Sequence, residues 1–235
     1  MKAPIVTCLL PTILLLTLAG PLVLADEGNI SKVNSSIRVE SGRTVGDVET
    51  VNGSITIEDS VTAGNVETVS GGVRIGRDSS VGSVESVNGG INLDTGAKSH
   101  GIEVVNGGVG LAERSHVAGN ITSVNGGIRL QEDAAVDGKV ENVNGGIQLE
   151  RARIGGGIKT VNGDIEVGEG SRVEGDIVVE KERGFSMGGK KRIPKVVIGP
   201  NAVVTGELRF EKEVELHVSK QAKVGKIVGA QPIRD

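Results

Sequence analysis

The sequence contains no Trp and no Tyr, and only two of its 235 residues are Phe. Globular cores draw much of their buried area from aromatic side chains, so an ordinary globular core is excluded. A platform of rings that stacks nucleic-acid bases is excluded for the same reason, and no nucleic-acid partner is expected. Proline is also scarce, at six residues, and glycine follows no three-residue period, which together exclude a collagen triple helix.

The only cysteine, Cys8, lies in an N-terminal segment that has the features of a secretion signal. A positive start at Met1 and Lys2 is followed by an uncharged apolar run that ends at Ala25. This pattern predicts a signal peptide of residues 1–25 that is cleaved after Ala25, and an exported protein in the periplasm, outside the cell or on its surface. The mature chain then lacks cysteine, so no disulfide or thiol chemistry is expected.

An uncleaved membrane anchor is the alternative interpretation of this segment, because an apolar run of this length could span a bilayer. Pro11, Gly20 and Pro21 disfavour a stable spanning helix. We therefore expect cleavage, and no stable transmembrane span after it.

Glycine, at 37 residues, and aliphatic side chains are abundant, and they occur in a repeat. The tripeptide Val-Asn-Gly begins at residues 51, 87, 105, 124, 143 and 161, and Val69-Ser70-Gly71 fills the one gap. Val33-Asn34-Ser35 is a degenerate first copy, and successive copies lie 18 or 19 residues apart. β-Branched residues favour strands and this composition is poor for helices, so the repeat indicates a β structure.

A period of six lies inside the longer one. Val, Ile or Leu stands at every sixth position from Val33 to Val117, with Ala63 and Ser99 as the exceptions. Three such segments make one turn with three faces. Aliphatic residues alternate with polar ones, as in Ile55-Thr56-Ile57, which is typical of a strand with one face inward. The sequence thus predicts an all-β fold, a single-stranded triangular parallel β-helix with about 18 residues per turn and roughly ten turns.

The repeat also divides the chain into regions. Residues 26–180 are predicted to be regular solenoid repeats. Residues 181–195 break the pattern and are predicted to form a basic protruding loop. Residues 196–235 hold the C-terminal solenoid turns and a tail, and Pro232 is expected to end the pattern.

Asn-Gly pairs mark one corner of the solenoid, where we expect left-handed backbone because glycine accepts it and asparagine tolerates it. Stacked amides at this corner are predicted to hydrogen-bond from turn to turn. We interpret the column as a structural ladder and not as a ligand site. Its members are Asn52, Asn88, Asn106, Asn125, Asn144 and Asn162.

A second column stands two positions before each repeated valine and is largely acidic. It reads Glu49, Glu67, Glu85, Glu103, Thr122, Glu141 and Lys159. Stacked glutamates repel one another if they point the same way. Screening by solvent and nearby cations is the favoured interpretation, and relief by a divalent cation such as Ca²⁺ is the alternative. No metal site and no cofactor is predicted.

Catalytic residues are not predicted either. The three histidines, His100, His116 and His217, fit neither the single catalytic histidine of hexapeptide acyltransferases nor a three-histidine metal site. We expect each of them to be an exposed polar residue. The sequence also has no nucleophile elbow and no phosphate-binding loop.

Charge is distributed unevenly along the chain. Residues 26–180 carry 24 acidic and 13 basic residues, whereas residues 181–235 carry 6 acidic and 12 basic ones. A rod that is acidic along its shaft and basic at one end is suited to association with other copies, head to tail or side by side. The basic loop offers Lys190, Lys191, Arg192 and Lys195 as a candidate site for an anionic cell-envelope polymer, with a solvated loop as the alternative.

The repeats resemble those of bactofilins, which are polymer-forming bacterial β-solenoids, and those of bacterial putative-adhesin solenoids. Two stretches carry the resemblance, residues 124–140 and residues 198–208. It implies a right-handed triangular helix whose ends join into filaments. Bactofilins are cytoplasmic, so the predicted signal peptide departs from that family.

These observations predict an exported, non-enzymatic structural or adhesin-like β-solenoid that can assemble as a homo-oligomer or polymer. One alternative is an envelope enzyme that acts on polysaccharide, although the acidic residues are spread over many turns and sugar-stacking rings are absent. The other is a binding module for an anionic envelope polymer that uses the basic loop.

Overall fold

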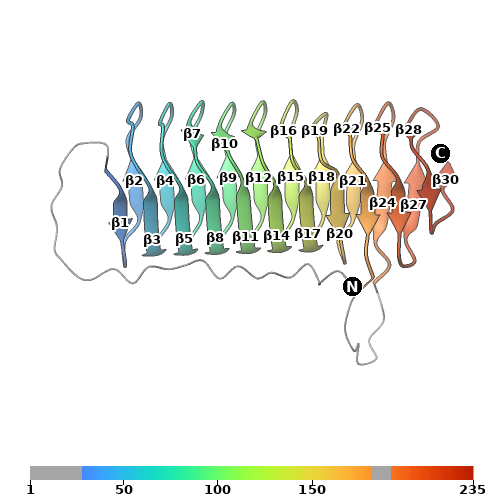
Figure 1. Cartoon of the computed structure of the whole chain (residues 1–235), viewed down its shortest axis with the longest axis horizontal. Helices are drawn as coiled ribbons and strands as arrows, with labels where there is room; N and C mark the ends of the chain where they lie inside the picture. Colours follow the sequence, from blue (N-terminus) through green and yellow to red (C-terminus); the bar gives the residue numbers. More distant parts are fainter. Residues whose placement is uncertain (1–27, 182–191, 235) are drawn as a thin grey trace, which may run out of the picture.

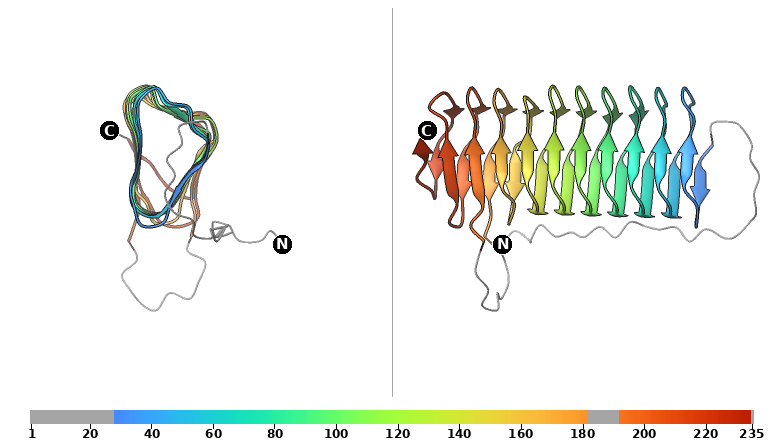
Figure 2. Two further views of the ribbon diagram at one scale, coloured as in Figure 1. Left: turned by 90° about the vertical axis from the view of Figure 1, so that its left-hand side faces the viewer. Right: turned by 180° about the vertical axis from the view of Figure 1, so that it is seen from behind.

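The computed structural model describes residues 28–181 and 192–234. Within these residues the chain winds into a rod of parallel strands without any helix, which confirms the predicted all-β parallel solenoid (Figure 1). Paired strands are 18 or 19 residues apart through most of the chain, as in Val48 with Val66 and Ile102 with Ile121. Viewed along the rod, successive turns superpose (Figure 2). The predicted signal peptide lies outside the described residues.

Three sheets run the length of the rod, and each turn contributes one strand to each sheet in most of the solenoid. Sheet A contains β1 (Ile30–Lys32), β3 (Val48–Asn52), β5 (Val66–Ser70), β8 (Val84–Asn88), β11 (Ile102–Asn106), β14 (Ile121–Asn125), β17 (Val140–Asn144), β20 (Ile158–Thr160), β23 (Ile177–Val179), β26 (Leu208–Phe210) and β29 (Ile227–Val228).

Sheet B follows sheet A in each turn. It contains β2 (Ile37–Val39), β4 (Ile55–Ile57), β6 (Val73–Ile75), β9 (Ile91–Leu93), β12 (Val109–Leu111), β15 (Ile128–Leu130), β18 (Ile147–Leu149), β21 (Ile165–Val167), β24 (Lys195–Ile198), β27 (Glu215–Val218) and β30 (Ile233–Arg234).

Sheet C is narrower, with strands of two residues. It contains β7 (Ser80–Val81), β10 (Lys98–Ser99), β13 (His116–Val117), β16 (Ala135–Val136), β19 (Arg153–Ile154), β22 (Arg172–Val173), β25 (Val203–Val204) and β28 (Lys223–Val224). We call the three connections in a turn the A–B, B–C and C–A corners.

Sheets A and B each have eleven strands in the described residues, so the solenoid has about eleven turns instead of the predicted ten. The repeat was read from Val33 onward, which left out the strand at Ile30–Lys32. The expectation that Pro232 ends the pattern was also wrong, because β30 follows it and pairs with β27. A proline directly before the first residue of an edge strand costs no ladder hydrogen bond.

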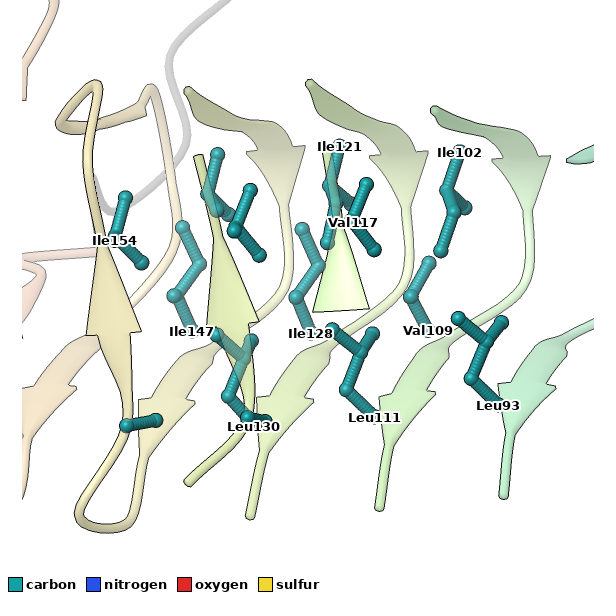
Figure 3. Packing of buried hydrophobic residues seen from close by; sticks show 14 of the residues in the cluster. Leu93, Ile102, Val109, Leu111, Val117, Ile121, Ile128, Leu130, Ile147 and Ile154 are labelled. Atoms are coloured by element: carbon teal, nitrogen blue, oxygen red, sulfur yellow. The ribbon is translucent and has the colours of Figure 1, made fainter. Parts of the chain in front are cut away.

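The core is a stack of aliphatic columns inside the three sheets. In the three-residue strands of sheet B the outer two residues are buried and the middle one points outward, as predicted for Ile55-Thr56-Ile57. Figure 3 shows part of the stack, with Leu93, Leu111 and Leu130 one above another on successive turns. Both exceptions to the six-residue period, Ala63 and Ser99, are buried too. The narrow interior, which aliphatic side chains fill, therefore explains why the chain has so few aromatic residues.

The backbone angles at the corners differ from those predicted. None of the ladder asparagines has a positive φ. Among the glycines of this corner, Gly71 and Gly145 do have a positive φ, of 145° and 134°. Most residues with a positive φ instead form a column at the B–C corner, which comprises Gly42, Ser60, Asp78, Gly96, Arg114, Asp133, Arg151, Gly170 and Asn201. The A–B corner needs glycine mainly because of close stacking. A Cβ on Gly107 would lie 2.3 Å from the carbonyl oxygen of Gly89 in the preceding turn.

Candidate functional site

The A–B corner carries the amide ladder on its outer side. The side-chain nitrogen of Asn106 donates to Oδ1 of Asn88 at 3.0 Å, and Asn125 donates in the same way to Asn106 at 3.0 Å. The series continues through Asn144, which donates at 2.9 Å, and Asn162, which donates at 3.2 Å. All these amides point in one direction, so their dipoles add along the rod.

A shorter segment of the ladder lies near the first turn, where Asn52 donates to Asn34 at 2.9 Å. The degenerate first copy of the repeat therefore belongs to the ladder. Ser70 stands in register between Asn52 and Asn88 and divides the ladder into two segments. The strand pairings place all six predicted ladder residues in one column, since Asn162 is joined to it by its hydrogen bond to Asn144.

The C-terminal end of the ladder carries a cation. The ammonium of Lys212 donates to Oδ1 of Asn162 at 2.7 Å. The last amide oxygen is the negative end of the aligned dipoles, so a positive charge stabilises it as it would at the C-terminus of a helix. The sequence pattern gave no signal for this contact because Lys212 is 50 residues away.

Buried hydroxyl and amide groups fasten the same corner from inside. Thr50 donates to the carbonyl oxygen of Ser35 at 3.0 Å, and Thr68 donates to that of Gly53 at 3.1 Å. Asn142 donates to the carbonyl oxygen of Gly126 at 2.6 Å. Sequence analysis missed this column, although polar residues at the third position of VETVN, VETVS and VENVN are its signal.

A side-chain-to-backbone ladder at the C–A corner was also missed. Oδ1 of Asp47 accepts the backbone N–H of Asn65 at 2.8 Å, and Oδ1 of Asn65 accepts that of Ser83 at 3.0 Å. The same bond joins Asn120 to Lys139 and Asp176 to Glu207. The recurring pair of Gly with Asn or Asp before a sheet A strand could have revealed it, because short polar side chains commonly satisfy turn backbones.

The predicted glutamate column lies on the outward face of sheet A. Glu49, Glu67, Glu85 and Glu103 occupy four consecutive rungs, in register with one another. The pKa of the Glu67 carboxyl is raised, first by partial burial and then by the charges of Glu85, Glu49 and Asp47. Burial and Glu103 raise the pKa of Glu85 in the same way. The column is therefore a line of mutually repelling charges.

Among residues 28–181 and 192–234, no group of three or more His, Cys, Asp and Glu side chains is placed to hold a metal ion. In these residues no arrangement of ligands supports the alternative interpretation, in which Ca²⁺ binds the glutamate column. Further along the column the charge reverses, because Lys159 and Arg209 occupy later rungs.

The basic loop is described only in part. Lys190 and Lys191 lie outside the described residues. Arg192 forms an ion pair with Asp164, whose other carboxylate oxygen accepts the backbone N–H of Lys195 at 2.9 Å. Lys195 begins strand β24 and lies 4.0 Å from a carboxylate oxygen of Glu215. Two of the four proposed anion-binding cations therefore already have acidic neighbours within the chain.

The histidines lie on different parts of the rod. His116 is in sheet C, 2.9 Å from a carboxylate oxygen of Asp137, and His217 is in sheet B, 2.6 Å from one of Glu215. His100 follows β10 and is exposed. His116 and His217 are half-buried, which differs from the exposure expected for them. The structure does not bring the three together on one sheet.

No protein-family model matches the chain, and no curated protein or solved structure is significantly similar to it. In the part of the chain that the structure describes, no helix is long and apolar enough to cross a membrane.

Proposed function

We propose that this protein is an exported, non-enzymatic structural or adhesin-like rod that joins end to end with other copies. The single observation that carries the proposal is the open edge of the last described turn. Within the described residues β28, β29 and β30 each pair with one strand only, on the side of the preceding turn, and their other edges have no described partner. Such an edge is a template for pairing with another chain.

The side chains of this turn support the same interpretation. Val224 and Ile227 pack against the core but are only half-buried, whereas their partners in the preceding turn, Val204 and Leu208, are fully buried. Ile233 is 51% exposed. A further turn from a second copy would cover these residues and continue all three sheets, which is how solenoid repeats stabilise one another.

The resemblance to bactofilins and bacterial putative adhesins adds to the proposal, because polymerisation through terminal turns is what the bactofilin resemblance implies. The signal peptide that the sequence predicts supports a location outside the cytoplasm. Its role there would be mechanical or adhesive, through long faces that are stiffened by stacked hydrogen bonds.

Negative-stain electron microscopy of the exported protein over a range of concentration and salt tests the proposal. We expect filaments or end-joined rods at high concentration. Charged substitutions in the last turn, Val224→Lys with Ile227→Lys, should return single short rods. A matched control, Arg172→Lys with Arg209→Lys, alters exposed positions of inner turns and should leave the filaments. Single rods from the unaltered protein at every concentration would contradict end-to-end joining.

A further inference from the structure

Asn-Gly pairs lie along the A–B corner, and in this dipeptide asparagine loses its side-chain amide more readily than in others. Glycine has no side chain to hinder the attack of its backbone nitrogen on the side-chain carbonyl carbon of the asparagine. The asparagines of these pairs are the ladder residues Asn52, Asn88, Asn106, Asn125, Asn144 and Asn162. A reaction at any of them would therefore change the amide ladder.

Most of these pairs are protected, because the N–H of the glycine is already engaged in a hydrogen bond. Gly107 donates to the backbone carbonyl of Asn125 in the next turn at 2.9 Å. The same bond to the next turn is made by Gly53, Gly89 and Gly126. Gly163 donates instead to Oγ1 of Thr160, at 3.0 Å. Such a bond must break before the nitrogen can lose its proton and turn toward the asparagine side chain, which makes the nitrogen a poor nucleophile.

Gly145 is the exception. Within residues 28–181 and 192–234 its N–H has no hydrogen-bond acceptor, although it occupies the same position of the repeat. The repeat predicts the backbone carbonyl of Asn162 as the acceptor. Strand β17 runs to Asn144, but its partner β20 ends at Thr160, so the pairing stops two residues before Asn162. Gly145 is half-buried and Asn144 is exposed, so water reaches the pair.

We propose that Asn144-Gly145 is a site of spontaneous modification, at which Asn144 deamidates before the asparagines of the other pairs. The Gly145 nitrogen loses its proton and forms a bond to Cγ of Asn144. The bond from Cγ to the side-chain nitrogen breaks, and this nitrogen takes up a proton and leaves as ammonia. Water then opens the cyclic imide, which gives aspartate or isoaspartate, and water is the only co-reactant.

The freedom of the side chains would predict a different order. Asn144 is held at both ends, because its amide donates to one neighbour in the ladder and accepts from the other. Asn52 and Asn88 lie on either side of the break at Ser70, and each has only one ladder neighbour. If side-chain freedom set the rate, Asn52 or Asn88 would react first. The two explanations therefore predict different sites.

A carboxylate at position 144 would interrupt the ladder. It can still accept from Asn162, but it has no N–H to donate to Asn125 and would repel the amide oxygen of that residue. The longer segment of the ladder would thus be divided as the protein ages. This inference goes beyond the proposed function, and neither end joining nor adhesion is needed for it.

Peptide mapping by mass spectrometry tests the site. The exported protein is incubated at mildly alkaline pH, where the glycine nitrogen loses its proton more readily, and is digested with trypsin at intervals. Basic residues separate the pairs into different peptides, with cleavage after Arg74, Lys98, Arg114, Arg129 and Arg151. We expect the mass gain of an amide-to-acid conversion first in the peptide that contains Asn144. The other pairs are internal controls, since they share the same solution and time.

Three outcomes of this mapping would overturn the inference. One is an earlier conversion at any other pair, and the second is an equal rate at all of them. The third is no conversion at Asn144 over a period in which a free peptide of residues 140–151 reacts completely.

Urea unfolding tests the effect on the ladder. Asn144→Asp should lower the unfolding midpoint, and the aged unaltered protein should shift toward the same value. Asn144→Gln, which lacks the reactive pair, should keep its own midpoint on ageing. Asn92→Asp, at an exposed position of sheet B outside the ladder, is the matched control and should change little. An unchanged midpoint in aged protein whose Asn144 has been converted would contradict the interruption of the ladder.

Discussion

The ammonium of Lys212 donates to the side-chain oxygen of Asn162 at 2.7 Å and so ends the amide ladder with a positive charge. The contact joins two residues that lie 50 positions apart in the sequence, on either side of the break in the repeat. It ties the last turns of the rod to the regular part at the corner where the ladder would otherwise stop.

Replacing Lys212 with methionine should therefore lower the free energy of unfolding by about 1–2 kcal/mol, because a hydrogen bond from a charged donor is lost. Hydrogen exchange should show the loss mainly in strands β26 and β27, which flank the residue. Lys220→Met, at an exposed position just after β27, is the control and should change little. Equal effects of the two substitutions would remove the ladder cap as an explanation.

The break at Ser70 offers a direct measure of what a rung of the ladder contributes. Ser70→Asn should join the two segments and raise the free energy of unfolding by about 1 kcal/mol. The reverse change, Asn125→Ser, removes two amide bonds and should lower it by about 1–2 kcal/mol. Urea unfolding measures both. A destabilised Ser70→Asn protein would argue against a continuous ladder.

The glutamate column predicts a dependence of stability on pH. Because the pKa of Glu67 is raised in the folded state, the folded protein holds its proton more tightly than the unfolded chain. Stability must then fall as the pH rises from the unfolded value, near 4.5, through the raised folded value, and stay lower above it. Glu67→Gln should be more stable than the unaltered protein at pH 7, and the difference should vanish at low pH.

Thermal melts from pH 3 to pH 8 measure this effect, with Glu40→Gln, an exposed position outside the column, as the control. Melts of the unaltered protein in Ca²⁺ and in EDTA should have the same midpoint. A higher midpoint in Ca²⁺ that is lost in Glu67→Gln would instead support cation binding at the column.

Because the turns stack closely at the A–B corner, we expect alanine to be tolerated less well at Gly107 than at Gly101. Gly107→Ala would place a Cβ 2.3 Å from the carbonyl oxygen of Gly89 and should destabilise the protein by about 1–3 kcal/mol. At Gly101 the nearest atom to an added Cβ is 3.6 Å away, so Gly101→Ala should be nearly neutral. Denaturant unfolding of the two alanine variants tests the contrast, and similar midpoints would refute it.

The six-residue period and the alternation in Ile55-Thr56-Ile57 were sufficient to predict the sheets, their pairing and most of the core. Periodicity failed where a residue type serves two purposes. The valine of Val-Asn-Gly has the spacing of a core residue yet points outward, because Val48 and Thr50 on the same strand already face inward. From the sequence, the glycines of the A–B corner were attributed to their backbone angle. In the structure the main constraint is the backbone of the preceding turn, which occupies the space that a Cβ would need.

The sequence repeat did not predict the contacts between residues that are far apart in the chain. Lys212 and Arg192 come after the break in the repeat, so the spacing could not assign them to their acceptors Asn162 and Asp164. The buried hydroxyl of Ser99, which has no hydrogen-bond partner, interrupts a column that holds Val81 and Val117 in the neighbouring turns, and nothing in the structure explains why it is retained.

Strands β21 and β24 pair in register even though Ile165 and its partner Val196 are 31 residues apart instead of 18. The segment between β23 and β24 adds chain without shifting any rung beyond it, since β23 still pairs with β26 and β24 with β27. Each turn of a solenoid depends only on its neighbours, so extra chain at a corner costs little. This corner is therefore a natural grafting point, at which an enzyme tag, an epitope or a fluorescent protein can be carried outward while the rod retains its pitch.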